Sequence, residues 1–191
     1  MPFVKDCVES IVDKVDRLVI VDGRYKDFPG DSWDSTDGTL EYILSIDKAD
    51  VISTLGYSEL DKRNRYLEEL SDGDIVLNLD ADEVLVGKIP MFEAQFGIID
   101  LIDNQCARKQ QRATRLFRFR EGMRYENVHY TLYWQGKMIN SLKKIVNPDF
   151  SFESIKGCWI EHNWHKREDL RKHYKSVYYK RLIRTEQGHP R

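Results

Sequence analysis

The first half of the chain alternates two patterns of apolar residues. Apolar side chains recur about every 3.6 positions over residues 4 to 15, which predicts an amphipathic helix, and the unbroken apolar run at 18 to 21 predicts a buried strand. The two patterns return as a helix from about residue 40, a strand at 50 to 54, a helix at about 60 to 70 and a strand at 75 to 79. This alternation predicts an α/β fold with a mostly parallel central sheet flanked by crossover helices.

From about residue 100 the pattern changes to one typical of antiparallel strands. The segments 114 to 120 and 128 to 134 are rich in β-branched, aromatic and arginine residues, and the breaks at Glu121-Gly122 and Gln135-Gly136 predict hairpin turns. We therefore expect a smaller antiparallel or mixed region after the parallel sheet. A basic amphipathic helix is expected at the C-terminal end, at about 168 to 186.

Composition narrows the class of protein. Hydrophobic residues make up 41% of the 191 positions and charged residues 32%, which is typical of a globular chain rather than a disordered one. The formal net charge of -2 argues against a surface built for nucleic acid, although arginines and aromatic residues interleave between 108 and 124. Three distant cysteines, with no long apolar segment and no secretory leader pattern, lead us to expect a cytoplasmic protein.

Carboxylates follow two of the predicted strands. Asp22 comes directly after the first strand, and Asp80-Ala81-Asp82-Glu83 follows the strand that ends at Leu79. The carboxyl ends of parallel strands form the ligand-binding edge of such a sheet. Two carboxylates at positions i and i+2 can share a hard divalent cation, which in turn binds phosphate oxygens. In isolation the same four residues also fit a polar turn before an acidic helix start.

Four motifs in order along the chain resemble the GT-A glycosyltransferases of the family-2 type. They are Val19-Ile20-Val21-Asp22, Ser35-Thr36-Asp37-Gly38-Thr39, Lys62-Arg63-Asn64 and Leu77-Asn78-Leu79-Asp80-Ala81-Asp82-Glu83. Weaker similarity continues through Arg115 to Arg118, Tyr125 to His129 and Ile160 to His162. The resemblance implies one Rossmann-like GT-A domain over residues 1 to 191. Its first half, to about 95, would bind a nucleotide sugar, and the rest would form the acceptor side and the basic C-terminal helix.

The resemblance also implies roles in donor binding. Asp22 would contact the base of the nucleotide, Arg63 and Asn64 would line its pocket, and Asp80 would meet ribose or metal-bound water. The segment Arg24 to Asp34 is an insertion relative to the family pattern, so the identity of the base stays open.

A divalent cation is the cofactor that the resemblance implies, as Mn²⁺ or Mg²⁺ held at Asp80 and Asp82. Asp82 would be the direct ligand. His162 follows an apolar, strand-like stretch and is a candidate third ligand through a neutral imidazole. A hydrogen-bonded surface histidine between Trp159 and Trp164 is the alternative reading of the same position.

An inverting enzyme of this class needs a carboxylate that takes the proton of the acceptor hydroxyl. Glu126 lies in the region that resembles the acceptor side, although Tyr130 stands where relatives often carry a glutamate beside His129. Asp149, in a turn that contains Pro148, is the second candidate. The sequence leaves the choice between Glu126 and Asp149 open, and each also fits a surface carboxylate.

The expected reaction is therefore transfer of a sugar from a nucleoside diphosphate sugar to an acceptor hydroxyl on a glycan, a protein or a lipid-linked molecule. The basic C-terminal helix would be a solvated face, a docking surface for anionic lipid, or a surface that holds a phosphorylated acceptor. A free sheet edge would favour a homodimer. The alternatives are a catalytically degenerate module that binds nucleotide sugars and, less favoured, a sugar nucleotidyltransferase, whose Gly-rich phosphate loop we do not find.

Overall fold

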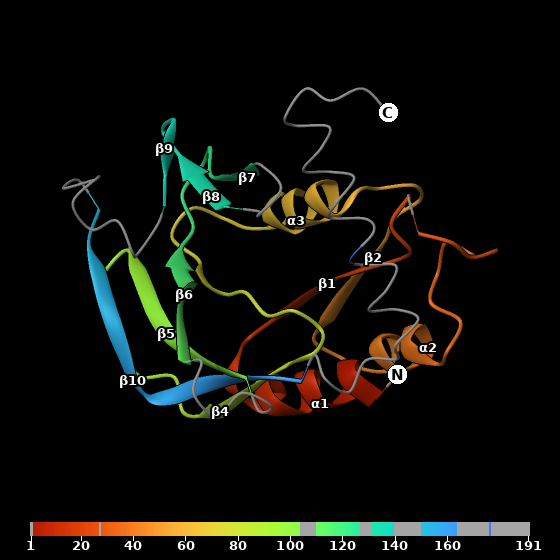
Figure 1. Ribbon diagram of the computed structural model, residues 1–191, viewed down its shortest axis with the longest axis horizontal. Coiled ribbons are helices and arrows are strands. Elements are labelled where there is room, and N and C mark those ends of the chain that lie inside the picture. The colour runs from red at the N-terminus through yellow and green to blue at the C-terminus, as the bar shows by residue number, and fades with distance from the viewer. Residues whose placement is uncertain are drawn as a thin grey trace.

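A computed structural model of the chain describes residues 2–26, 28–103, 110–126, 131–139, 150–163 and 176 (Figure 1). Its helices are Pro2–Ile11 (α1), the short 3-10 helix Val12–Lys14 (η1), Thr39–Leu44 (α2) and Glu59–Leu67 (α3). Its strands are Leu18–Asp22 (β1), Ala49–Ser53 (β2), Ile75–Leu77 (β3), Glu83–Gly87 (β4), Phe96–Asp103 (β5), Gln110–Arg118 (β6), Arg124–Glu126 (β7), Thr131–Trp134 (β8), Lys137–Met138 (β9) and Phe152–His162 (β10).

Most of the locally predicted elements in these ranges are confirmed. The apolar run at 18 to 21 is strand β1, and the pattern at about 60 to 70 is helix α3. Helix α3 begins at a capping box, in which Ser58 and Asp61 each bond to the backbone N–H of the other. The expected turn at Gln135-Gly136 joins β8 to β9, and both residues have positive φ, of 50° and 71°. Asp149 and, apart from residue 176, the expected C-terminal helix lie outside the described residues.

The expectation of a mostly parallel, helix-flanked GT-A sheet is wrong. Strands hold more of the described chain than helices do, and they form a parallel pair β1-β2, a curled mixed sheet of order β3-β6-β5-β10-β4 and an antiparallel sheet β7-β8-β9. In the mixed sheet the pairing of β5 with β10 is parallel and the other pairings are antiparallel. Strand β3 was expected beside the early parallel strands, and it pairs with β6 instead.

The physical reason lies in what the apolar pattern encodes. A local pattern fixes that a segment is a strand and which face it buries, but the partner depends on chain segments far away in sequence. Strand β3 has three residues, whereas β6 has nine and β10 has eleven. These long strands of the second half dominate the sheet, and β3 and β4 become its edges.

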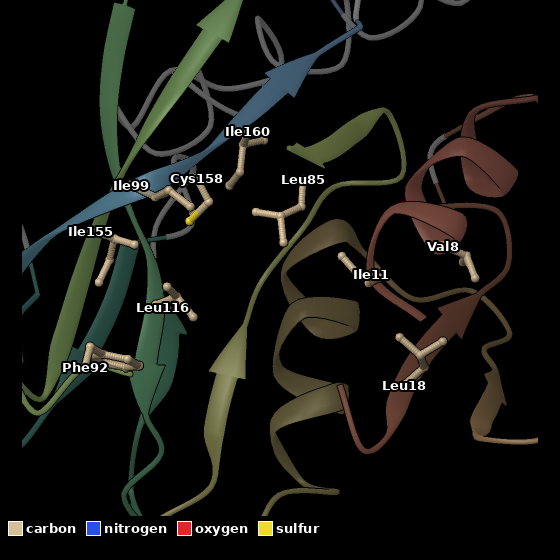
Figure 2. Packing of buried hydrophobic residues seen from close by; sticks show 10 residues of the cluster. All are labelled: Val8, Ile11, Leu18, Leu85, Phe92, Ile99, Leu116, Ile155, Cys158 and Ile160. Atoms are coloured by element: carbon tan, nitrogen blue, oxygen red, sulfur yellow. The ribbon is translucent and has the colours of Figure 1, made fainter. Parts of the chain in front are cut away.

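Two hydrophobic clusters hold these elements together. Figure 2 shows the first, in which Val8 and Ile11 of α1 lie near Leu18 of β1, while Leu85 and Ile160 come from the facing sheet. Helix α1 is also tied to this sheet by hydrogen bonds, because the amide of Leu85 donates to Ser10 Oγ at 3.1 Å. The cluster thus fixes the start of β4, directly after the Asp80–Glu83 turn.

The second cluster joins α3 to the three-stranded sheet. Leu67 of α3 packs with residues of β5 to β8 and the segments around them, namely Phe96, Phe117, Phe119, Met123, Tyr125, Leu132, Ile139 and Phe150. Helix α3 therefore lies between the parallel pair and the sheet β7-β8-β9, as Figure 1 shows. None of the helices in the described ranges has the length and apolar character that a membrane crossing requires.

Candidate functional site

The turn between β3 and β4 is closed by its own residues. The amide of Glu83 donates to the carbonyl oxygen of Asp80 at 2.9 Å, and the amide of Asp80 donates to the Glu83 carboxylate at 2.8 Å. The amide of Asn163, directly after β10, donates to the carbonyl oxygen of Asp82 at 2.8 Å. The turn is therefore held both by its own residues and by the residue that follows β10.

His162, the last residue of β10, lies beside Asp82. Its Nε2 is 3.3 Å from Asp82 Oδ2, and the carboxylate of Asp82 is 6% exposed while the His162 side chain is 26% exposed. The placement follows from the register of β10 with β4, in which His162 is the partner of Glu83. The two residues, predicted as metal ligands from distant parts of the sequence, thus lie next to each other, with Asp82 buried and His162 partly exposed.

Asp80 is held by arginines from two different elements. Arg63 Nη2, from α3, is 2.7 Å from Asp80 Oδ1, and Arg115 Nη2, from β6, is 3.4 Å from Oδ2. Arg63 also contacts Glu59 at 3.3 Å. Burial alone would lower the pKa of Arg63, but Asp80 and Glu59 outweigh it and keep that pKa above its ordinary value.

Glu83 is the most deeply buried carboxylate of this turn, with 1% of its surface exposed. Its carboxylate accepts a hydrogen bond from Arg115. Burial raises the pKa of the Glu83 carboxyl, and the positive charge of Arg115 opposes that shift. The thiol of Cys7, on α1, donates to the Asp80 carbonyl oxygen. Burial, together with the charges of Glu83, Asp80 and Asp82, raises the pKa of Cys7 to about 12.

Asp22 braces the loop that follows β1. Its buried carboxylate accepts hydrogen bonds from the amide of Ser35 at 3.1 Å and from Ser35 Oγ at 2.6 Å. The next residue, Gly23, has φ +121°, and a side chain there would meet the Thr54 carbonyl oxygen at 2.7 Å. The motif Ser35 to Thr39 is thereby held against the carboxyl end of β1, directly before α2.

Helix α3 connects the Asp22 end of this region to the Asp80 turn. The Lys62 amino group donates to the Gly23 carbonyl oxygen and lies 5.1 Å from the centre of the Tyr25 ring. Burial lowers the pKa of Lys62 to about 8, although the charges of Asp22 and Glu59 oppose the shift. Glu59 also contacts Arg63, which in turn contacts Asp80. The charged residues of α3, which are Glu59, Lys62 and Arg63, therefore lie between Asp22 and Asp80.

The side-chain amide of Asn64, also on α3, forms hydrogen bonds with the backbone of β7 instead of with these charged residues. Its Nδ2 donates to the Tyr125 carbonyl oxygen at 3.1 Å, and its Oδ1 accepts from the Tyr125 amide at 2.7 Å. Asn64 thereby pairs with Tyr125 as a neighbouring strand residue would. Glu126, the next residue on β7, forms an ion pair with Arg124 at the surface, so the structure does not bring it into the Asp82 cluster.

Sequence reasoning did not single out Glu59, and it quoted Lys62 and Arg115 only as parts of motifs, without a role. It also missed the structural part played by Glu83. Arg115 lies in a strand that also carries Arg112 and Arg118, so its charge did not single it out. Glu59 and Lys62 gave no signal either, because charged residues at the start of a helix are usually solvated.

The metal-binding capacity of the cluster rests on few protein ligands. Within the described ranges, no group of three or more histidine, cysteine, aspartate or glutamate side chains is arranged to hold a metal ion. Asp82 and His162 form a pair with one oxygen and one nitrogen donor. Comparison of the chain with protein-family models and with curated proteins gives no match.

Proposed function

We propose that this protein transfers a sugar from a nucleoside diphosphate sugar to an acceptor hydroxyl, with a divalent cation at Asp82 and His162. The observation that carries the proposal is the contact between these two side chains at 3.3 Å, at the end of a turn that carries Asp80 and Glu83 as well. The ordered motifs of the first half suggest the reaction class, and the contact supports a cation at these two side chains, which would in turn bind the diphosphate.

The donor set of this pair fits a cation that is shared with a nucleotide. Mg²⁺ and Mn²⁺ commonly bind one or two protein carboxylates and complete their coordination with phosphate oxygens and water. An imidazole beside a carboxylate favours Mn²⁺ over Mg²⁺, because Mg²⁺ prefers oxygen ligands. A protein site with two ligands therefore fits a cation that arrives with a diphosphate.

The charge balance of the cluster also fits. The carboxylates of Asp22, Glu59, Asp80, Asp82 and Glu83 outnumber the basic side chains, which are Lys62, Arg63 and Arg115. A diphosphate alone would be repelled by this surplus of negative charge. A divalent cation bound together with the nucleotide removes the repulsion, which explains why such a site would need a metal.

Each residue of the cluster then has a role in donor binding. Asp82 and His162 would hold the cation, which when bound stabilises the charge that develops on the leaving diphosphate. Asp80, oriented by Arg63 and Arg115, would accept a hydrogen bond from ribose or from water. Asp22 keeps the Ser35 loop in place next to the expected position of the base.

The acceptor side of the proposal involves a proton transfer. As the acceptor oxygen forms its bond to the anomeric carbon, the bond to the diphosphate breaks and the hydroxyl proton passes to a carboxylate. Glu126 and Asp149 remain the candidates for that base. Glu126 is paired with Arg124 in this structure, so accepting a proton would require that ion pair to open.

Isothermal titration of the full chain with UDP and with GDP, with and without Mn²⁺, tests the proposal. We expect metal-dependent binding of one nucleotide that is lost in Asp82→Asn, which keeps the shape of the side chain. The matched control is Asp16→Asn, an exposed carboxylate that precedes the amino end of β1. Binding of neither nucleotide would contradict the proposal. Binding of the sugar nucleotide without any donor hydrolysis would favour the degenerate binding module.

A further inference from the structure

We infer that Arg115 is a positioning residue of the proposed cation site, which it serves by holding the Asp80–Glu83 turn from strand β6. The inference rests on the proposed function for its ligand; Arg115 itself lies outside the four motifs, and the turn that it holds is the end of the fourth. No part of that turn comes from β6, and Arg115 reaches it across the β3–β6 pairing.

A β-bulge directs Arg115 toward the turn. Along β5 and β6, Gly97 is the partner of Leu116 and the next residue, Ile98, is the partner of Thr114. Arg115 is therefore the additional residue of the bulge, without a partner on β5. Bulges bend a strand and redirect a side chain, and they are common next to functional sites. On its other edge, the Arg115 carbonyl oxygen accepts from the Asn78 amide at 2.8 Å, which fixes the bulge against the segment that leads to Asp80.

One amino group of Arg115 bridges two carboxylates of the turn. Its Nη2 donates to Glu83 and lies 3.4 Å from Asp80 Oδ2. Glu83 in turn accepts from the Asp80 amide, so Arg115, Glu83 and the backbone of Asp80 form one network. The carboxylate of Glu83 is otherwise almost completely buried, and the guanidinium of Arg115 is a positive charge that faces it.

Arg115 also retains an unused donor. Among the described residues, its Nε is buried and has no hydrogen-bond partner. An ordinary structural arginine would satisfy this N–H, because a buried donor without a partner is costly. The contacts that place the guanidinium in this structure are those of Nη2 with the two carboxylates of the turn.

The test uses the full-length protein, Mn²⁺ and UDP. In Arg115→Met combined with Glu83→Gln, the buried charge is removed together with its partner, so the fold has no unpaired buried carboxylate. We expect the Mn²⁺ dissociation constant, measured by electron paramagnetic resonance in the presence of UDP, to rise about tenfold, as is typical when a residue that supports a metal ligand is lost. The spectrum of bound Mn²⁺ should broaden, which a purely structural role would not cause. Arg112→Met, an exposed arginine on the same strand, is the matched control and should bind like the wild type.

Arg115→Lys provides a second test, in which the side chain at this position keeps its positive charge. It should bind Mn²⁺ with an affinity between the wild type and the double variant, because a lysine supplies charge without the fixed planar geometry. Unchanged Mn²⁺ affinity and an unchanged spectrum in both variants would overturn the inference while leaving the proposed function intact. Absence of Mn²⁺-dependent UDP binding in the wild type would overturn both.

Discussion

The imidazole of His162 and the carboxylate of Asp82 lie 3.3 Å apart, brought together by the pairing of strands β10 and β4. The contact unites a residue near the C-terminal end with the turn after β3. It gives the cluster of charges around Asp80 one point at which a buried oxygen donor and a nitrogen donor on a partly exposed side chain lie together. The proposed cation site depends on this relationship.

Replacing His162 with Gln should weaken the binding of Mn²⁺ in the presence of UDP by at least about tenfold, since a direct ligand should matter no less than the residues that support it. The metal-free protein should unfold at nearly the wild-type temperature, because the side chain is partly exposed. Titration calorimetry and thermal unfolding measure the two effects. Equal Mn²⁺ affinity in the wild type and the variant would show that His162 is not a ligand of the cation.

Replacing Lys62 with Met should change how stability depends on pH. The folded pKa of Lys62 is about 8, below its ordinary value of 10.5, so the unfolded chain binds more protons between these two values. The contribution of Lys62 is therefore fully present above pH 10.5 and is lost as the pH falls toward 8. As the pH rises from 8 to 10.5, the free energy of unfolding of the wild type should increase by up to about 3 kcal/mol relative to that of the variant. Urea unfolding at several pH values measures this difference. Parallel curves would contradict the burial of the amino group.

Cys7 should resist alkylation in the folded protein. Its pKa is raised to about 12, mainly by burial and further by Glu83, Asp80 and Asp82, so almost no thiolate forms near pH 8. Iodoacetamide followed by peptide mapping should find Cys7 unmodified in buffer and modified in urea. Rapid modification in buffer would show that α1 opens away from the turn.

Asn64→Ala should lower the stability of the fold and leave the affinity for UDP unchanged. Loss of both amide bonds to the Tyr125 backbone should destabilise the fold by about 2 kcal/mol, because the strand is left with an unsatisfied donor and acceptor. Asn64→Asp keeps the acceptor but sets a carboxylate oxygen against the Tyr125 carbonyl oxygen, so it should also destabilise the fold. Urea unfolding and UDP titration separate the two effects. A large loss of UDP affinity at unchanged stability would instead favour the direct nucleotide contact that the resemblance implies.

Local elements could be predicted from the sequence, but their pairing could not. The apolar run of β1 and the start of α3 at Ser58 depend on neighbouring residues, so both were found. The partner of β3 depends on β6, about 40 residues later, and no local pattern encodes that choice.

The same distinction holds for the cluster of charges. Asp82 could be proposed from its spacing to Asp80 and its position after a strand, and His162 from its motif. The contact between them, however, is set by the β10–β4 register. Arg115 is directed by a bulge, which the sequence does not mark. Asn64 could not be separated from a ligand-binding residue without knowing that the Tyr125 backbone lies within reach.

The most direct test is the electron spin echo of Mn²⁺ bound with UDP, recorded for the wild type and for His162→Gln. A histidine nitrogen coordinated to Mn²⁺ produces a modulation that carboxylate, phosphate and water ligands do not. We predict this modulation in the wild type and its loss in the variant. A wild-type spectrum without nitrogen modulation, or one that the His162 substitution leaves unchanged, would contradict a cation held between Asp82 and His162.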